Sequence, residues 1–216
     1  QVTDIDVSVS TTKQVADALR FNVEVAPDKF DVRMIRWSQK SPDGKTMLFQ
    51  ALGKLYTKDI ASGKMSRLTT QNTDDEYFPR YSNDGKYIVY TTWNDESLGR
   101  VMRIAASGGE PEAITNTPGH YVEPAFSTNG KKIAYRKFTG GYLLDPAYSM
   151  DPGLYVADLT TGEHTHISQH GQEPHFAGDN SRVYFTESVG GTAYPETQLA
   201  SVNLHGKDKQ VHVYGA

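Results

Sequence analysis

Short alternating and apolar runs joined by tight turns repeat along most of the chain. In the clearest of them, over 81–90, aromatic and β-branched residues flank Asn83-Asp84-Gly85, whose residues tolerate the positive φ of a hairpin turn. The pattern recurs with its turn acid or amide at Asp43, Asp84, Asn129 and Asp179, in steps of 41, 45 and 50 residues. A repeat of this length built of short strands predicts the blades of a β-propeller.

Each repeat continues in the same order after its hairpin. Third strands are predicted at 55–60, 101–104, 154–159 and 199–204. A glycine turn follows, and fourth strands are predicted at 67–69, 113–115, 166–168 and 211–213. This predicts an all-β fold, a β-propeller of four four-stranded antiparallel blades that is partial or open. A flat sandwich is the alternative, but it does not repeat its turn chemistry at a fixed offset.

The repeat divides the chain into blades and a leader. We place the blades at about 35–72, 73–118, 119–170 and 171–216, and residues 1–34 outside them as connecting strands. Strict alternation of Ile5, Val7 and Val9 with polar residues predicts a half-buried strand over 4–10. One helical turn is expected over 14–19 and a second strand over 21–25.

Composition narrows the classes of partner and site. The net charge of −4, the pI near 6.0 and the lack of any Lys/Arg cluster longer than two residues argue against nucleic acid as a partner. The chain has no cysteine, which excludes disulfides and thiolate ligands or nucleophiles. No apolar run reaches transmembrane length, so no transmembrane segment is expected. Gln1 opens no signal peptide, so an export signal would have been removed.

The insertions in the repeat fall on one face of the predicted propeller. The turns after the first and third strands stay short, whereas the loops between second and third strands lengthen at 91–100, 136–153 and 187–198. Insertions confined to one face are typical of a binding face. Loop residues that could contact a partner, or instead pack the loops against the propeller, are Trp93, Asp95, Tyr142 and Tyr148.

The segments leading into the first strands lie on the same face and align on Pro79, Pro124 and Pro174. Because the first strand of a blade is innermost, these segments are expected to ring the mouth of the central channel. The ring contributes the candidates Asp75, Tyr77, His120, Glu123, His170 and Glu173. Its two histidines and two glutamates could hold a divalent metal or a small polar ligand. The alternative is that they cap turns and bond to backbone across blades. No other cofactor is expected.

Other motifs carry weaker signals. His164-Thr165-His166 has the His-x-His spacing of a pair of metal ligands. The motif falls on the outermost strand of a blade, however, where two histidines on one exposed face of the strand explain it. Asp59 and Asp158 follow third strands and are interpreted as structural acids that satisfy backbone groups. No Gly-x-Ser-x-Gly elbow is present, so we predict no catalytic residue.

The repeat resembles a known family. Ser41-Pro42-Asp43-Gly44-Lys45, then the strand at 55–60 and the run from Gly63 to Thr69, is similar to the WD40-like, TolB-type propeller repeat over about residues 35–213. The fourth blade departs from it, with Asp179-Asn180 in place of Asp-Gly. The runs at 51–56, 92–95 and 118–124 resemble the TolB-like propeller that precedes a metal-dependent amidohydrolase domain in large exported bacterial proteins.

That resemblance implies a periplasmic or otherwise extracytoplasmic setting and an attached hydrolase domain. We therefore expect a non-catalytic module that binds a protein partner or gates access to a hydrolase. The alternative is that the channel mouth itself binds a metal or small ligand as part of an amidohydrolase-type enzyme. Uncovered faces of the terminal blades are also expected to favour self-association.

Overall fold

The fold is taken from a computed structural model that describes residues 5–15, 25, 27–138, 150–190 and 196–214. The chain divides into two compact units, Gln1–Asp31 and Val32–Ala216. They are described separately below.

In the first unit, the strand predicted over 4–10 is not formed by residues 5–10. Ile5, Val7 and Val9 are 83%, 79% and 85% exposed, so the alternating apolar side chains are not half-buried. A strand needs a paired edge for its backbone groups, and no described residue pairs with this segment. The helical turn predicted over 14–19 and the strand predicted over 21–25 fall largely outside the described residues.

The second unit contains sixteen described strands in four antiparallel sheets of four. The first sheet comprises β1 (Arg36–Lys40), β2 (Thr46–Ala51), β3 (Lys54–Asp59) and β4 (Met65–Arg67). The second comprises β5 (Asp75–Tyr81), β6 (Tyr87–Trp93), β7 (Val101–Ala105) and β8 (Glu112–Ala113). The third comprises β9 (Tyr121–Phe126), β10 (Lys132–Lys137), β11 (Gly153–Asp158) and β12 (His164–Ser168). The fourth comprises β13 (Gln172–Phe176), β14 (Arg182–Val189), β15 (Glu196–Asn203) and β16 (Gln210–Tyr214).

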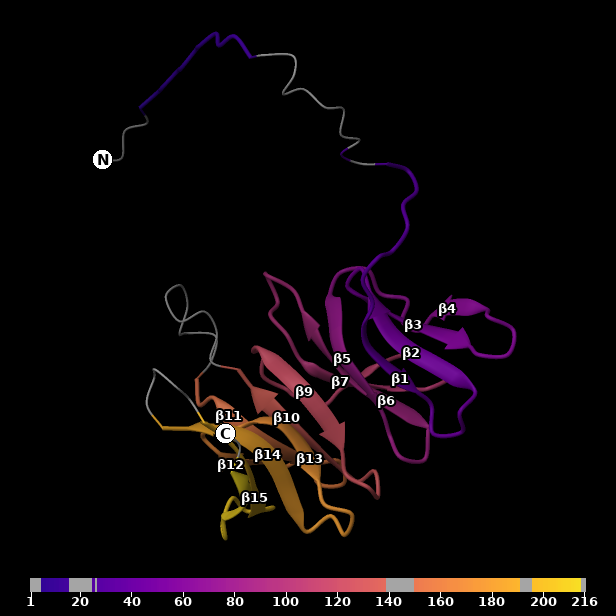
Figure 1. The fold of residues 1–216 in the computed structure, drawn as a ribbon, viewed down its shortest axis with the longest axis vertical. Helices are drawn as coiled ribbons and strands as arrows, with labels where there is room; N and C mark the ends of the chain where they lie inside the picture. Colours follow the sequence, from indigo (N-terminus) through magenta and orange to yellow (C-terminus); the bar gives the residue numbers. More distant parts are fainter. Residues whose placement is uncertain (1–4, 16–24, 26, 139–149, 191–195, 215–216) are drawn as a thin grey trace. The chain divides into compact units, whose positions relative to one another are not determined.

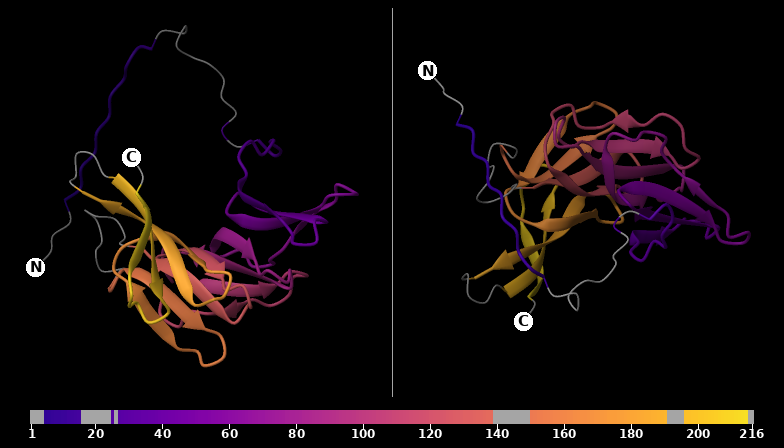
Figure 2. Two further views of the ribbon diagram at one scale, coloured as in Figure 1. Left: turned by 60° about the horizontal axis from the view of Figure 1, so that its bottom comes forward. Right: turned by 90° about the horizontal axis from the view of Figure 1, so that it is seen from above.

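The four sheets follow one another in chain order, as Figure 1 shows and as the two further views in Figure 2 repeat. Their first strands, β1, β5, β9 and β13, contact one another in succession, so the first strand of each sheet is innermost. Each interface between consecutive sheets has its own hydrophobic cluster, represented by Leu48 with Tyr90, Val89 with Ile133, and Leu154 with Phe185. The prediction of an all-β propeller of four four-stranded antiparallel blades is confirmed.

The fourth strands of the first two sheets lie one or two residues earlier than predicted. β4 ends at Arg67, although the sequence suggested 67–69, and β8 ends at Ala113 rather than at residue 115. Leu68 and Thr69 leave the sheet edge and bury their side chains, at 6% and 2% exposure. The Leu68 N–H still donates to the Leu55 carbonyl, over 2.9 Å. Burial between sheets therefore outweighs continuation of the strand.

The repeated turns satisfy their polar groups locally. In each of the first three, the Oδ1 atom of the turn residue accepts bonds from the serine hydroxyl two residues earlier and from the N–H two residues later, for Asp43, Asp84 and Asn129. The hydroxyl of Ser82 and the N–H of Lys86 thus lower the pKa of Asp84. Gly85 follows with a φ of 71°, and Asn180 takes the equivalent place in the fourth turn with a φ of 61°. Asparagine tolerates this left-handed conformation, which explains the departure from Asp-Gly.

The first strands of all four sheets carry a β-bulge at one repeat position. Pairing between the first and second strands shifts register at Trp37, Phe78, Glu123 and Glu173, whose φ angles are 48°, 52°, 56° and 53°. In three blades the next residue is proline, and positive φ at a residue other than glycine costs conformational energy. β-Bulges are frequent next to functional sites, where they redirect a side chain, so this repeat position is a candidate part of a site.

Candidate binding face

An aromatic pocket of about 460 Å³ opens between the first three blades. It contains the bulge residues of the first two blades and the innermost segment of the third. Its aromatic and imidazole side chains are Trp37, Tyr77, Phe78, Trp93, His120, Tyr121 and Phe138, and Arg36 and Arg136 also line it. We call it the aromatic pocket.

The rings of the aromatic pocket contact one another across blades. Trp37 of β1 packs against Phe78 of β5 with ring centroids 4.4 Å apart and meets Tyr77 edge-on at 6.1 Å. His120 lies 5.1 Å from the Trp93 ring and 5.1 Å from the Phe138 ring. These contacts fix the pocket walls, and the rings stay partly exposed to the pocket.

Two carboxylates next to the pocket accept hydrogen bonds from the polar groups of its aromatic side chains. The Trp93 indole N–H donates to Asp95 over 2.8 Å, and the Tyr77 hydroxyl donates to Asp75 over 3.3 Å. Burial, together with the Asp75 charge, raises the pKa of Tyr77, so this hydroxyl stays protonated and can donate. Asp75 and Asp95 thus orient aromatic side chains and do not line the aromatic pocket themselves.

His120 is held in its neutral form. Burial lowers the pKa of His120 below its ordinary value of 6.5, and the nearby Arg136 guanidinium lowers it further. A neutral imidazole between two aromatic rings extends the apolar wall of the pocket at pH 7.

Glu123 links the third blade to the fourth. One carboxylate oxygen accepts a bond from Arg136 Nη2 over 2.6 Å, and the other accepts the backbone N–H of Glu173 over 2.7 Å. Its side chain is only 13% exposed. Glu123 is thus engaged in cross-blade bonding, as the structural alternative expected, and the Glu173 side chain is exposed.

The ring of candidates is not gathered into a metal centre among the residues that the structure describes, where no group of three or more His, Cys, Asp or Glu residues could hold an ion. His170 lies apart from His120, in a second pocket of about 260 Å³ between the third and fourth blades. The residues Tyr142 and Tyr148 lie outside the described part of the chain.

The second pocket contains a buried acid that the sequence did not single out. Glu187 is 5% exposed and accepts bonds from Lys209 and from Gln198, both over 2.6 Å. Burial alone would raise the pKa of Glu187, but these bonds and the charges of Lys209 and His170 together lower it. The carboxylate is therefore charged, and its Oε1 atom is bonded within the fourth blade.

The weaker candidates have structural roles. His164 Nδ1 lies 2.8 Å from the Tyr135 hydroxyl, and His166 stacks on Tyr155 with centroids 4.6 Å apart. The Asp59 carboxylate accepts the N–H and the hydroxyl of Ser62. Asp158 accepts bonds from backbone N–H groups and from Lys132, and the Lys132 bond is the main reason that the pKa of Asp158 falls to about 2.

The structure therefore brings together Tyr77, Trp93 and His120 of the predicted set, with Asp75 and Asp95 beside them. Arg36, Arg136 and Glu76 were missed as site or framework residues. Trp37 and Phe78 occupy the repeat position of the predicted Glu123 and Glu173, so comparing that column across blades would have found them.

The comparison with known proteins agrees with this architecture. No protein-family model matches the chain. It is 32% identical over 117 residues to the Tol-Pal system protein TolB of Francisella tularensis subsp. holarctica (strain OSU18), a match that covers 53% of this chain and 25% of that protein. The structure of putative TolB from Agrobacterium tumefaciens superposes with a TM-score of 0.66 at 20% identity, covering 82% of this chain and 61% of that one. The chain carries a β-propeller of the TolB type.

The matched stretch spans only about a quarter of the length of this curated TolB relative. The fold of this chain is also shared by an oligogalacturonate lyase in complex with manganese, with a TM-score of 0.65 at 13% identity, covering 82% of this chain and 52% of that one. At that identity the likeness concerns fold alone. Among the described residues, no helix has the length and apolar character needed to cross a membrane.

Proposed function

We propose that this TolB-type propeller is a non-catalytic module that binds a protein partner through the aromatic pocket. The observation that carries the proposal is the pocket itself, in which partly exposed aromatic rings from three blades converge on one site. Aromatic side chains fixed by packing supply large contact area at a small cost in conformational entropy, and they are enriched at protein interfaces.

The likeness to TolB supports a binding role, because that relative is a protein of a multi-component system, the Tol-Pal system. By the resemblance of the repeat, we further propose an extracytoplasmic setting and an attached hydrolase domain whose access the module gates. The engagement of Glu123 with Arg136 and Glu173 favours binding over metal chemistry at the mouth.

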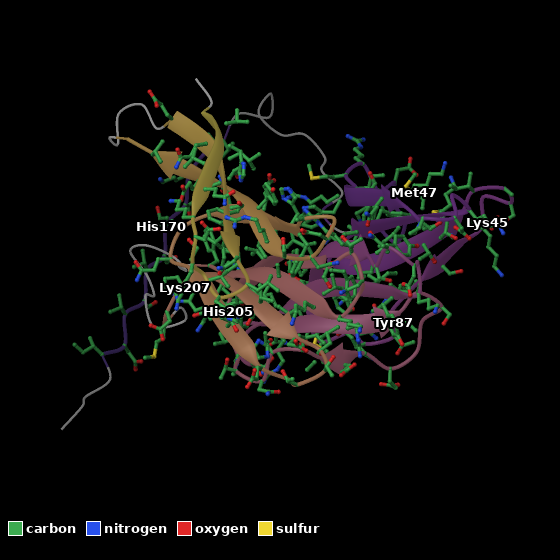
Figure 3. All side chains as sticks on the ribbon, turned by 90° about the horizontal axis from the view of Figure 1, so that it is seen from below. Lys45, Met47, Tyr87, His170, His205 and Lys207 are labelled. Carbon is green, nitrogen blue, oxygen red and sulfur yellow. The ribbon has the colours of Figure 1, made fainter. Side chains whose placement is uncertain are left out.

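Site-specific photocrosslinking in the native host tests the proposal. A photoreactive phenylalanine analogue replaces Tyr77 in the pocket or, as the control, Tyr87 at the other end of the same sheet. Tyr87 is 40% exposed and is labelled in Figure 3. We expect a discrete crosslinked protein at position 77 that is absent at position 87 and lost when Trp37→Ala is added. Equal crosslinking at both positions, or none at position 77, would contradict the proposal.

A further inference from the structure

The charged side chains that line the aromatic pocket are two arginines, Arg36 and Arg136, and none of its described lining residues is a carboxylate. The acids beside the pocket are already bonded, Asp75 and Asp95 to Tyr77 and Trp93, and Glu123 to Arg136. Among the described residues, a ligand in the pocket therefore meets arginines as charged lining groups, whereas the acids beside it are already hydrogen-bonded.

The charge of the lining side chains indicates whether the pocket suits a cationic or an anionic ligand. Aromatic rings can form a cage for a cation, because a cation is attracted to a ring face. Here two ring faces already have guanidinium groups, with Arg36 Cζ 5.9 Å from the Trp37 centroid and Arg136 Cζ 4.9 Å from the Phe138 centroid. Arg136 is paired with Glu123, so it is Arg36 that would repel a further cation and attract an anion.

The two arginines differ in how their donors are used. Arg136 Nη2 is paired with Glu123, and its buried Nε finds no acceptor among the described residues. Arg36 is exposed and makes no ion pair with a described residue, and its Nη2 contacts only the Met34 sulfur, at 3.3 Å. Among the described residues, Arg36 is thus the pocket cation without an ion pair, and a guanidinium matches a carboxylate with two parallel hydrogen bonds.

We propose that the aromatic pocket binds the carboxyl terminus of a peptide chain, with an aromatic or large aliphatic last side chain among the rings and its carboxylate on Arg36. The inference rests on the proposed function and names the partner's chemistry. Apolar walls and a cation at the edge suit a group in which an apolar side chain and a carboxylate share one carbon atom.

The two tryptophans of the chain, Trp37 and Trp93, both line the aromatic pocket. Intrinsic tryptophan fluorescence of the unlabelled protein therefore reports entry of a ligand directly. The probes are short Gly-Ser peptides ending in Phe or Leu, each as the free acid and as the carboxyl-terminal amide, together with the same peptides ending in Lys.

We expect the free acids to change the fluorescence saturably and to bind about tenfold more tightly than the amides, as for the loss of a charge-assisted hydrogen bond. Arg36→Gln should remove the preference for the acid, Arg36→Lys should keep part of it, and Lys45→Gln, which removes an exposed charge at a hairpin turn (Figure 3), should leave it unchanged.

Equal affinity of acid and amide, no response to either free acid at millimolar concentration, or tighter binding of the Lys peptides would each overturn the inference. Equal binding of 3-phenylpropionate and the Phe peptide would overturn the peptide as the source in favour of a small acid. Failure of the crosslink at position 77 would instead contradict the proposed function, so the two proposals can fail separately.

Discussion

The hairpin turns and the first-strand bulges of this propeller repeat at the same interval but differ in how they use their residues. At the turns, the side chain that defines the motif bonds to neighbours within two residues, as Asp84 does with Ser82 and Lys86. At the bulges, the side chains reach other blades: Trp37 contacts Phe78, and Glu123 binds the backbone of Glu173.

The difference shows which repeat positions keep the same type of residue in every blade and which can vary. A turn residue must satisfy the same local groups in each blade, so its chemistry is nearly constant. A bulge has a constant backbone, yet its side chain meets a different neighbour in each blade. The bulge residue is aromatic in the first two blades and glutamate in the last two, so this repeat position differs between the blades. Four variants test whether cross-blade contacts outweigh local ones.

The largest effect is expected at Glu76, next to the second bulge. This carboxylate is fully buried and accepts bonds from the Leu55 N–H, the Thr69 hydroxyl and the Gln71 amide. Glu76→Leu leaves the first two donors buried without an acceptor and should lower the free energy of unfolding by about 3 kcal/mol or more. Urea denaturation measures this change in the free energy of unfolding, with Glu76→Gln as the milder control. A smaller decrease than that caused by Asn129→Ala, the turn variant described below, would contradict the cross-blade role of Glu76.

Next comes Glu123 at the third bulge. Glu123→Ala removes the partner of Arg136 and the acceptor of the Glu173 N–H, and it should cost about 2 kcal/mol, since the pair is only partly exposed. A double-mutant cycle with Arg136→Met isolates the pair by urea denaturation. A coupling near zero would show that the two side chains do not stabilise each other.

The matched turn variant is Asn129→Ala. It removes the acceptor of the buried Ser127 hydroxyl and of the exposed Lys131 N–H at a hairpin turn, and it should cost about 1 kcal/mol because both bonds are local and one is exposed. Urea denaturation of this variant and of Glu123→Ala under one condition gives the comparison directly. If the turn variant is the less stable of the two, local bonding outweighs cross-blade bonding.

The smallest effect concerns pH. The lowered pKa of His120 means that the unfolded chain takes up a proton near pH 6.5 while the folded chain resists it. Stability from this group is present above 6.5, falls as pH drops below 6.5, and levels off below the folded pKa. His120→Phe should reduce the loss of unfolding free energy between pH 7.5 and about 5.5. An identical pH dependence in both proteins would contradict the buried, neutral assignment.

The repeat made much of the fold predictable. Turn residues such as Asp84 and Gly85 act on the backbone within a few residues, so their spacing alone predicted the four sheets. The predicted strand over 4–10 failed at residues 5–10, because alternation prescribes a face and not a partner edge. The predicted ends of β4 and β8 were wrong for a similar reason, because the burial of Leu68 depends on the adjacent blade.

The sequence by itself therefore determined the blade, its hairpins and the side of the propeller with the insertions, because these follow from local φ preferences and strand periodicity. Only the tertiary structure decided which side chains form the site. It joined Trp37, Tyr77 and His120 from three blades into one pocket and engaged Glu123 with the backbone of Glu173. Such contacts join residues roughly one repeat apart, and their geometry is set by the packing of one blade on the next.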